Sequence, residues 1–415
     1  MRGFELGTVT VGLLAFAWVS NACRMANDPM VDSGSMPVVA TGCVATKAPR
    51  FVDRTDDQLP ELTRFCMDAQ PFDADGDGDL DLFLAQEFVE NVLLINDGTG
   101  TFTDVSDARL PRARRDSEDI AIIDFNGDEH SDVFIVSEDD RTNELYLNDG
   151  TGTFTDDSAS IPVEGRSNGV VAIPLDDDAT PDLVIGNAGL NTALLSALPL
   201  VDVTTQRLPD QTDTTQDLEA GDVDGDGDFD LIVANESDNV LWRNDGTGTF
   251  TAEPSAIALR ASPEETREAE LGDVDGDGDL DLVFANIQVF VAQADRANRL
   301  LINDGTGQFT DAPDGALPSD NDDTFDVELF DLDADGDLDL VTANLDQLSG
   351  GGGERYRVYE NDGQGMFTEA TNTFFDRSVR GNGFDIEVAD FSGDGRPDLY
   401  LCSRGGQDRL LIAQP

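Results

Sequence analysis

A nine-residue acidic loop that recurs seven times constrains this chain more than any other feature. Its clearest copy is DVDGDGDFD at residues 222–230, with carboxylates at positions 1, 3, 5, 7 and 9 and glycines at positions 4 and 6. Alternating Asp and Gly disfavours helix and strand, because Asp hydrogen-bonds its own backbone and Gly loses the most conformational entropy on folding. The spacing favours a tight loop whose oxygens converge on a hard cation, which takes about six to eight oxygen ligands.

The seven copies begin about every 50 residues, which indicates an array of similar structural units. We number them loops 1 to 7; their first positions are Asp73, Asp124, Pro174, Asp222, Asp273, Asp331 and Asp390. Loops 2 and 7 replace the third-position Asp with Asn126 and Ser392. Loop 3 is the degenerate copy, because Pro174 replaces its first Asp and only Asp176, Asp178 and Asp182 remain. A single acidic turn could simply be solvated, but a repeated one favours metal binding.

Each repeat has the pattern of four short strands. One strand ends at the loop, an apolar strand such as residues 229–235 follows, and a third strand leads into Asn-Asp-Gly and a fourth. Asp-Gly between β-forming segments is a strong hairpin signal. The seventh repeat stops after its third strand, and residues 51–53 resemble the missing fourth one. We therefore predict an all-β fold, a seven-bladed β-propeller of four-stranded blades that is closed by an N-terminal strand completing the last blade.

These loops and hairpins resemble the FG-GAP/VCBS repeat proteins, whose seven-bladed propellers are similar to the integrin α-subunit head. The resemblance covers residues 51–415 and implies that each loop binds Ca²⁺ through side chains at positions 1, 3, 5 and 9 and the carbonyl at position 7. It implies five to six ions, with loop 3 doubtful. The implied ligand positions are Asp73, Asp75, Asp77, Asp79 and Asp81; Asp124, Asn126, Asp128, His130 and Asp132; Asp222, Asp224, Asp226, Asp228 and Asp230; Asp273, Asp275, Asp277, Asp279 and Asp281; Asp331, Asp333, Asp335, Asp337 and Asp339; and Asp390, Ser392, Asp394, Arg396 and Asp398.

A second acidic pattern precedes the loops. Acids stand five residues before position 1 in six repeats, and Glu stands three residues before it in the last four. Residues two positions apart point to the same side of a strand, so each pair of acids lies on one face of the innermost strand. The simpler interpretation is a solvated acidic lining of the central channel, and a second ion site is the alternative. The residues are Asp68, Asp119, Asp217, Glu219, Glu268, Glu270, Asp326, Glu328, Asp385 and Glu387.

Charge and termini bear on location and partners. The chain has 86 acidic and 25 basic residues and a net charge of −61, so we expect it to bind neither nucleic acid nor an anionic membrane. Residues 1–22 resemble a secretory signal peptide and residues 23–50 a flexible tether before the propeller of residues 51–415. Four cysteines suit an oxidising compartment, with three pairings open. Cys23 follows the cleavage site, so lipidation there stays open, and we expect a secreted or surface-anchored protein.

The sequence favours binding over catalysis. The one histidine, His130, lies in a loop, and no nucleophile elbow is present. We expect a monomeric calcium-binding module that binds a protein or glycan; the alternatives are a calcium-dependent, lyase-like polysaccharide enzyme and a purely structural part of a larger surface assembly. Insertions in the fifth and sixth repeats place possible anchors on the face opposite the metal loops, since long loops on a rigid scaffold often carry binding. These residues are Phe290, Arg296, Arg299, Arg355, Tyr356 and Arg357.

Overall fold

A computed structural model describes residues 51–414 of the chain, except residues 179, 320–321 and 346–355. The predicted signal peptide and tether therefore lie outside the described residues, and their boundaries stay predictions. Everything below concerns the described residues between 51 and 414.

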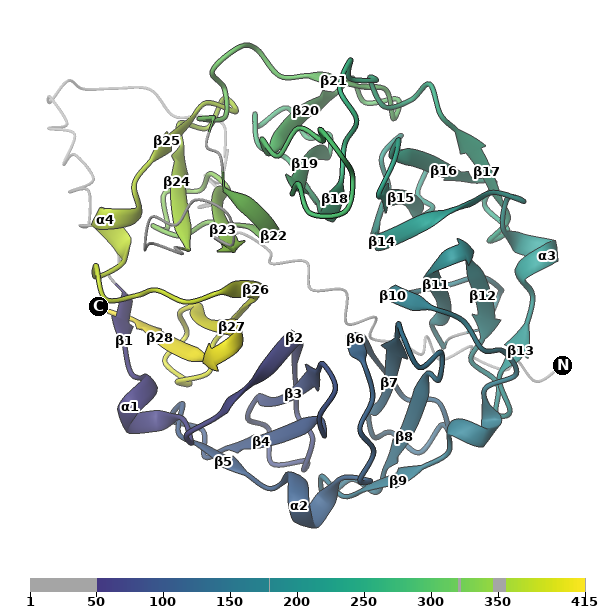
Figure 1. The fold of residues 1–415 in the computed structure, drawn as a ribbon, viewed down its shortest axis with the longest axis vertical. Coiled ribbons are helices and arrows are strands. Elements are labelled where there is room, and N and C mark those ends of the chain that lie inside the picture. Colours follow the sequence, from purple (N-terminus) through teal and green to yellow (C-terminus); the bar gives the residue numbers. More distant parts are fainter. Residues whose placement is uncertain (1–50, 179, 320–321, 346–355, 415) are drawn as a thin grey trace, which may run out of the picture. The chain divides into compact units, whose positions relative to one another are not determined.

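The strands pair in seven antiparallel groups of four, which form the blades of a ring (Figure 1). Blade 1 contains β2 (Thr63–Phe72), β3 (Asp81–Gln86), β4 (Val92–Asn96) and β5 (Phe102–Asp104); blade 2 contains β6 (Ser117–Ile123), β7 (Asp132–Ser137), β8 (Glu144–Asn148) and β9 (Phe154–Asp156); blade 3 contains β10 (Ser167–Ile173), β11 (Asp182–Leu190), β12 (Thr192–Leu195) and β13 (Val201–Asp202); blade 4 contains β14 (Thr212–Gly221), β15 (Asp230–Asn235), β16 (Val240–Asn244) and β17 (Phe250–Glu253).

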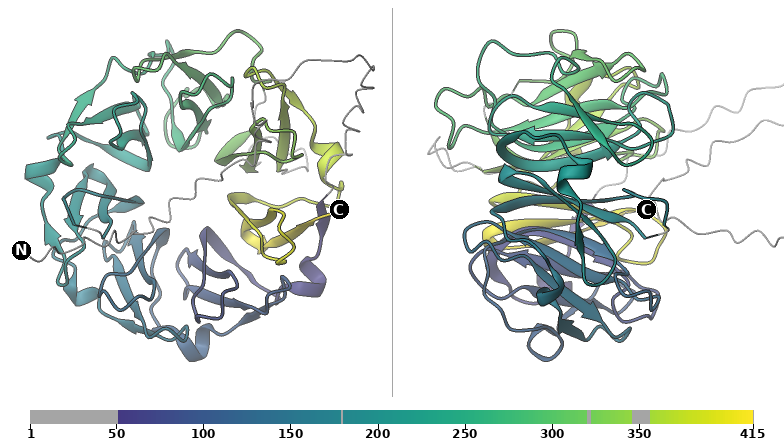
Figure 2. Two further views of the ribbon diagram at one scale, coloured as in Figure 1. Left: turned by 180° about the vertical axis from the view of Figure 1, so that it is seen from behind. Right: turned by 90° about the vertical axis from the view of Figure 1, so that its right-hand side faces the viewer.

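The remaining three blades repeat this order. Blade 5 contains β18 (Thr266–Gly272), β19 (Asp281–Asn286), β20 (Arg299–Asn303) and β21 (Phe309–Asp311); blade 6 contains β22 (Asp323–Phe330), β23 (Asp339–Leu345), β24 (Arg357–Asn361) and β25 (Phe367–Glu369); blade 7 contains β26 (Gly383–Ala389), β27 (Asp398–Gln407), β28 (Arg409–Ala413) and β1 (Phe51–Asp53). The acidic loops join the first and second strands of each blade. The first strands lie nearest the centre of the ring in Figure 1, and Figure 2 shows the same order from behind.

The hydrophobic core lies between neighbouring blades. The second strands, such as β3 and β15, are buried along their whole length, which explains why they are apolar on both faces. One cluster joins Leu84 and Phe102 of blade 1 to Phe391 and Tyr400 of blade 7. Because each blade packs against two others, closing the ring removes apolar surface that an open array would expose to water.

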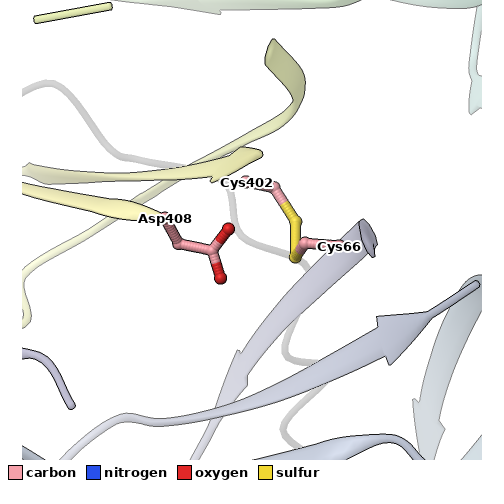
Figure 3. Close-up of side chains that lie close together, drawn as sticks. All are labelled: Cys66, Cys402 and Asp408. Carbon is pink, nitrogen blue, oxygen red and sulfur yellow. A yellow bond between two sulfur atoms is a disulfide. The ribbon is translucent and has the colours of Figure 1, made fainter. Parts of the chain in front are cut away.

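The N-terminal strand completes the last blade, as predicted from the sequence. Phe51 pairs with Ala413 and Asp53 with Leu411 in an antiparallel ladder between β1 and β28. A disulfide between Cys66 of β2 and Cys402 of β27 joins blade 1 to blade 7, with a Cα–Cα distance of 5.4 Å (Figure 3). The ring is therefore closed by backbone pairing and by a covalent bond.

Short helices follow the outer strands, which the sequence analysis did not predict. They are α1 (Thr55–Gln58), α2 (Ser106–Arg109), the 3₁₀ helix η1 (Ser158–Ser160), α3 (Thr204–Arg207) and α4 (Thr371–Phe374). An Asp two residues before the first helical residue starts most of these turns; Asp104 Oδ1 accepts the Ser106 N–H at 3.0 Å, and Ser106 Oγ accepts the Leu93 N–H at 2.9 Å. In the part of the chain that the structure describes, no helix is long and apolar enough to cross a membrane.

Replacing both seam cysteines should weaken the closed ring. The disulfide joins residues 336 positions apart. On the loop-entropy account, the Cys66→Ala/Cys402→Ala variant should lose up to about 5 kcal/mol of unfolding free energy. Denaturant unfolding of the oxidised proteins measures this loss, with Cys43→Ala as the control. An unchanged unfolding midpoint in the double variant would show that the disulfide does not stabilise the ring.

Candidate metal-binding loops and the opposite face

The first-position carboxylate organises the backbone of each complete loop. Asp73 Oδ1 accepts the N–H groups of Gly76 at 2.8 Å and Asp77 at 3.1 Å, and its Oδ2 accepts that of Gly78 at 3.1 Å. Asp124, Asp222, Asp273, Asp331 and Asp390 accept matching bonds in loops 2, 4, 5, 6 and 7. This wrapping needs positive φ at positions 4 and 6, which Gly76 and Gly78 adopt at 77° and 95°.

The last-position carboxylate anchors the loop to its blade. Asp81 is fully buried; its Oδ2 accepts the Ala74 N–H at 3.0 Å and its Oδ1 accepts the Asn96 N–H at 2.8 Å. The same position is buried in every loop, namely at Asp132, Asp182, Asp230, Asp281, Asp339 and Asp398. One oxygen of this carboxylate thus closes the loop on itself, and the other attaches the loop to the third strand of the blade.

Carboxylate oxygens meet inside these loops. Oxygens of Asp73, Asp75 and Asp81 lie within 4.8 Å of one another, as do those of Asp222, Asp224 and Asp226. Asp75 Oδ1 and the equivalent Asp333 Oδ1 of loop 6 are buried without a hydrogen-bond partner. A buried carboxylate oxygen that lacks a donor is costly unless a cation contacts it. Loops with several acidic side chains and orphaned oxygens therefore fit a hard cation such as Ca²⁺.

The other predicted positions contribute in different ways. Position 5 shapes the loop, as Asp77 Oδ1 accepts the Asp79 N–H at 3.0 Å. Side chains at position 7 pack against the glycine of the hairpin in the same blade: a side chain at Gly98 would clash with Asp79, and one at Gly150 would clash with His130. The equivalent Arg396 of loop 7 pairs with Asp394. These side chains leave the backbone carbonyl as the group that position 7 can offer to an ion.

Loop 3 lacks the central hydrogen-bond acceptor of the other loops. Pro174 provides no carboxylate, and the remaining contacts are local, from the Asp178 N–H to Asp176 Oδ1 at 2.9 Å and from the Leu175 N–H to Asp182 Oδ2 at 3.0 Å. In loop 4, Arg243 of β16 pairs with Asp224 and lies 3.8 Å from Asp230 Oδ2. Loop 3 therefore has the poorest ligand set, and a cation in loop 4 would compete with an arginine.

Burial controls the charge of the anchoring carboxylates. It raises the pKa of Asp81 and Asp339 to about 7 and that of Asp132, Asp230 and Asp281 to about 6, although the backbone N–H bonds oppose the rise. Neighbouring loop acids add to the effect in each case. A bound cation would favour the ionised form of these groups and reverse the rise.

The hairpin asparagine joins neighbouring blades, a role that the sequence analysis missed. Asn96 Nδ2 donates to Phe391 O of loop 7 at 2.9 Å, and Asn148 Nδ2 donates to Ala74 O of loop 1 at 2.8 Å. Asn303 and Asn361 make the same contact with Val223 O and Val274 O. The signal was present in the repeated Asn-Asp-Gly, which was interpreted only as a turn. In blades 1, 2, 5 and 6 the hairpin therefore holds the metal loop of the preceding blade, which is blade 7 in the case of blade 1.

A chain of arginine and aromatic side chains occupies the opposite face. We name it the arginine–aromatic cluster; its members are Arg267, Phe290, Phe325, Phe384 and Arg404, from blades 5 to 7. The Arg267 guanidinium carbon lies 5.6 Å from the ring centre of Phe290 and 5.3 Å from that of Phe325. Phe325 stacks on Phe384 with ring centres 4.2 Å apart, and the Arg404 guanidinium carbon lies 5.2 Å from Phe384. Phe290 lies at one end of this row of side chains and is 66% exposed at the surface.

The structure corrects part of the predicted ligand set. Arg299 is 2% exposed, its Nε bonds Asp311 Oδ1 at 2.6 Å and its Nη1 lies 3.2 Å from Glu264 Oε2. Tyr356 is 1% exposed and donates its hydroxyl to Cys402 O at 2.8 Å. Both residues belong to the protein interior and cannot anchor a ligand.

The other four predicted ligand residues differ in availability. Arg355 lies outside the described residues. Arg296 forms an ion pair with Asp323 at 3.5 Å, and Arg357 forms one with Asp322 at 2.5 Å. Phe290 is exposed, and Phe88 and Phe65, which the sequence analysis did not single out, are 56% and 42% exposed on the same face. The predicted arginines that the structure describes, Arg296, Arg299 and Arg357, are therefore paired with acids, and exposed phenylalanines are the distinguishing feature of this face.

Comparisons with known proteins agree with this architecture. A profile described as FG-GAP-like repeat matches residues 73–135, 124–185, 201–284, 286–342 and 344–401. Cartilage acidic protein 1 from Homo sapiens is 27% identical over 175 residues, which is 41% of this chain and 25% of that protein; the Mus musculus protein is 27% identical over 178 residues. The chain thus spans about a quarter of the length of the curated relatives it matches.

Solved structures share the fold at low sequence identity. BBS1N in complex with ARL6DN superimposes with a TM-score of 0.56 at 12% identity, over 89% of this chain and 98% of that one. YCF48 bound to D1 peptide gives a TM-score of 0.53 at 11% identity, over 92% of this chain and all of that one. At these identities the comparison shows the β-propeller fold alone.

The metal-free protein should lose stability as the pH rises. The anchoring carboxylates have folded-state pKa values of about 6 to 7 against an ordinary value of 3.8, so folding takes up protons between about pH 4 and pH 7. Each proton taken up costs about 1.4 kcal/mol of unfolding free energy per pH unit across this window. Melting in chelator should therefore occur at a higher temperature at pH 5 than at pH 8.

An isosteric variant tests the origin of this pH dependence. Asp81→Asn removes one buried titrating group and should flatten the dependence of the melting temperature on pH, whereas Asp79→Asn in the same loop should leave it nearly unchanged. A melting temperature in chelator that rises from pH 5 to pH 8 would contradict the assignment of protonated anchoring carboxylates.

Proposed function

Because this chain belongs to the FG-GAP-like repeat family, we propose that it is a calcium-binding, secreted or surface-anchored propeller that binds a protein or glycan partner. One observation carries the proposal: the arginine–aromatic cluster presents exposed Phe290 on the face opposite the metal loops. The loops then stabilise the ring from one face, and the partner binds the other.

The chemistry of the loops supports calcium. Their side-chain donors are almost all oxygens of Asp, Asn and Ser, the ligand type that Ca²⁺ prefers, and three of the loops hold a buried carboxylate oxygen without a hydrogen-bond partner. Loops 1, 2, 4, 5, 6 and 7 offer a carboxylate at the first position. Loop 3 does not, and Arg243 competes in loop 4. Five to six ions per chain is therefore the proposed stoichiometry.

Two observations support a location outside the cell. The Cys66–Cys402 disulfide suits an oxidising compartment, and residues 1–22 have the pattern of a secretory signal. The similarity to cartilage acidic protein 1 covers only part of either protein and adds little. Whether Cys23 carries a lipid depends on processing, which the fold of the ring does not influence.

The arginine–aromatic cluster has the properties of a preorganised recognition surface. Its side chains are held by cation–π contacts and ring stacking, so little side-chain entropy would be lost on binding. Arg404 is paired with Glu87 through Nε and Oε2 at 2.8 Å; burial lowers the pKa of Arg267, and the negative charges of Glu118, Glu236 and Glu265 oppose that shift. Because acids already neutralise these arginines, an apolar or aromatic group on the partner suits the surface better than an anionic one.

A binding role suits this face better than a catalytic one. His130 packs against the hairpin of its own blade on the metal-loop face, away from the arginine–aromatic cluster. Glu87 pairs with Arg404 of the cluster, and Glu265 accepts the backbone N–H groups of Val289, Phe290 and Val291. A monomeric binding module is therefore our proposal, and turnover of an acidic polysaccharide is the outcome that would replace it.

Removing one complete loop should reduce the stabilisation by calcium. If each site has an affinity of about 0.1 mM and calcium is at about 1 mM, binding contributes roughly 1.4 kcal/mol per site. The Asp73→Asn variant should lose about this part of the calcium-dependent stability, or about 2 °C of melting temperature for a domain of this size. Asp176→Asn in loop 3 is the matched control and should behave as wild type. Equal melting shifts in all three proteins would exclude the loop sites as the source.

The proposed partner surface can be tested with matched hydrophobic residues. The Phe88→Ala/Phe290→Ala variant should weaken binding at least tenfold to any partner found on a glycan panel or by pull-down in calcium. Met366→Ala, which removes a residue that is 40% exposed on the metal-loop face, should leave binding unchanged. Binding that survives the double variant, or that is lost in Met366→Ala, would place the site elsewhere.

The same preparations distinguish the enzyme alternative. Incubation with acidic polysaccharides in calcium should release no unsaturated uronate, which is detected by its ultraviolet absorbance. Release at a rate that calcium controls would assign the chain to polysaccharide lyases and overturn the binding proposal.

A further inference from the structure

The acids of the innermost strands face one another across the axis of the ring. Electrostatic repulsion from Asp119 on blade 2 contributes to raising the pKa of Glu268 on blade 5 and of Glu387 on blade 7. Among the residues that the structure describes, none of the ten axial acids forms an ion pair with an arginine. The acids are Asp68, Asp119, Asp217, Glu219, Glu268, Glu270, Asp326, Glu328, Asp385 and Glu387.

Many axial acids have a structural role that explains their presence. Asp385 Oδ2 accepts the Ala69 N–H of the next blade at 3.1 Å, and Asp217 Oδ2 accepts the Ala269 N–H at 3.1 Å. Asp119 Oδ2 accepts the Val170 N–H at 2.6 Å. These carboxylates tie each inner strand to its neighbour, so an acidic inner ring alone does not indicate a ligand.

At the seam between blades 7 and 1, Asp68 has a buried oxygen without a donor. Asp68 is only 7% exposed, and its Oδ2, like that of Asp326 on blade 6, has no hydrogen-bond partner; Asp326 nevertheless accepts the Ile386 N–H of the next blade. Its expected donor, the Ile120 N–H of blade 2, bonds Asp119 Oδ1 at 2.6 Å instead. One buried carboxylate oxygen at the seam therefore lacks any protein donor.

Glu387 lacks the usual backbone donor at the same seam. On blade 4 the equivalent Glu219 accepts the N–H of Leu271 on blade 5. On blade 1 the residue equivalent to Leu271 is Pro71, because Pro71 pairs with Leu82 just as Leu271 pairs with Leu282. Proline has no N–H to donate. The Gln70 amide nitrogen replaces it, lying 3.3 Å from Asp68 Oδ1 and 3.2 Å from Glu387 Oε1.

Three carboxylates thus converge at this seam. Asp68, Asp385 and Glu387 each offer an oxygen, and these atoms lie within 4.8 Å of one another. Oxygens held 2.3–2.6 Å from a calcium ion would have such separations. Burial, and then Asp119, raise the pKa of Asp68, as expected for a carboxylate with no counter-charge nearby.

We propose that Asp68, Asp385 and Glu387 bind a divalent cation of the calcium class on the ring axis, at a site separate from the seven loops. The Gln70 amide orients two of the ligands. The Cys66–Cys402 disulfide joins the same two blades, and β1 completes blade 7 beside them, so the ion closes the ring at the seam from its inner side.

Counting bound calcium tests this site independently of the loops. Equilibrium dialysis of the full chain should show one ion fewer per chain in Asp68→Asn than in wild type, and likewise one fewer in Glu387→Gln. Both changes keep the size of the side chain. Glu270→Gln, an axial acid on blade 5, is the matched control and should bind the wild-type number. Asp73→Asn should lose a different ion, so its combination with Asp68→Asn should lose two.

The alternative is that protons alone neutralise the seam acids. In that case Asp68→Asn and Glu387→Gln would bind as many ions as wild type, and both would melt at a higher temperature than wild type in chelator because folding no longer has to take up a proton at the substituted residue. That result would overturn the axial site. If the loops bind no calcium, wild type should still bind the one ion that Asp68→Asn loses, so failure of the loop sites and failure of the axial site are distinguishable.

Discussion

The buried carboxylate at the end of each acidic loop is the interaction on which this ring depends. At Asp81 one oxygen accepts the N–H of Ala74 within the loop, and the other accepts the N–H of Asn96 on the third strand. Asn96 in turn donates its side-chain amide to the loop of blade 7. A single aspartate therefore couples the shape of the loop, the register of the hairpin and the contact between blades. A cation bound in the loop would therefore affect the loop shape, the hairpin register and the contact between blades.

The extreme negative charge has a structural explanation in this fold. Carboxylates serve as acceptors for backbone N–H groups that no strand ladder satisfies, at the loops, at the starts of the short helices and between the inner strands. Such bonds are stronger than those to neutral acceptors. Their cost is the burial of charged groups, which raises the pKa of Asp81 and Asp326 to about 7; at Asp81, repulsion from Asp75 and Asp77 adds to the rise. A bound divalent cation would offset this cost while leaving the hydrogen bonds in place.

The sequence predicted the features that repeat. The loop spacing and the Asp-Gly turns predicted the strand order, and the missing last strand predicted the pairing of Phe51 with the C-terminal strand. The short helices were missed because Asp-x-Ser/Thr at a strand end depends on a local side-chain bond that leaves no periodicity. Nor could spacing choose among the cysteine pairings, since Cys66 and Cys402 meet only when the ring closes.

The ligand residues were the least predictable part. Arg299 and Tyr356 lie next to long insertions and resemble surface anchors in the sequence, yet Arg299 starts β20 beside Glu264 and Tyr356 reaches the backbone of blade 7. Burial of a polar side chain depends on a partner from a distant segment, which one sequence does not reveal. The arginine–aromatic cluster was missed for the same reason, because its members come from different blades.

Long-wavelength anomalous scattering from crystals grown in calcium tests the role of the loops most directly. Peaks are expected in loops 1, 2, 5, 6 and 7, with one in loop 4 if calcium displaces Arg243, and none at Asp176 and Asp178 of loop 3. A map without peaks in the complete loops, or with a fully occupied ion in loop 3, would contradict the link between the loop carboxylates and calcium.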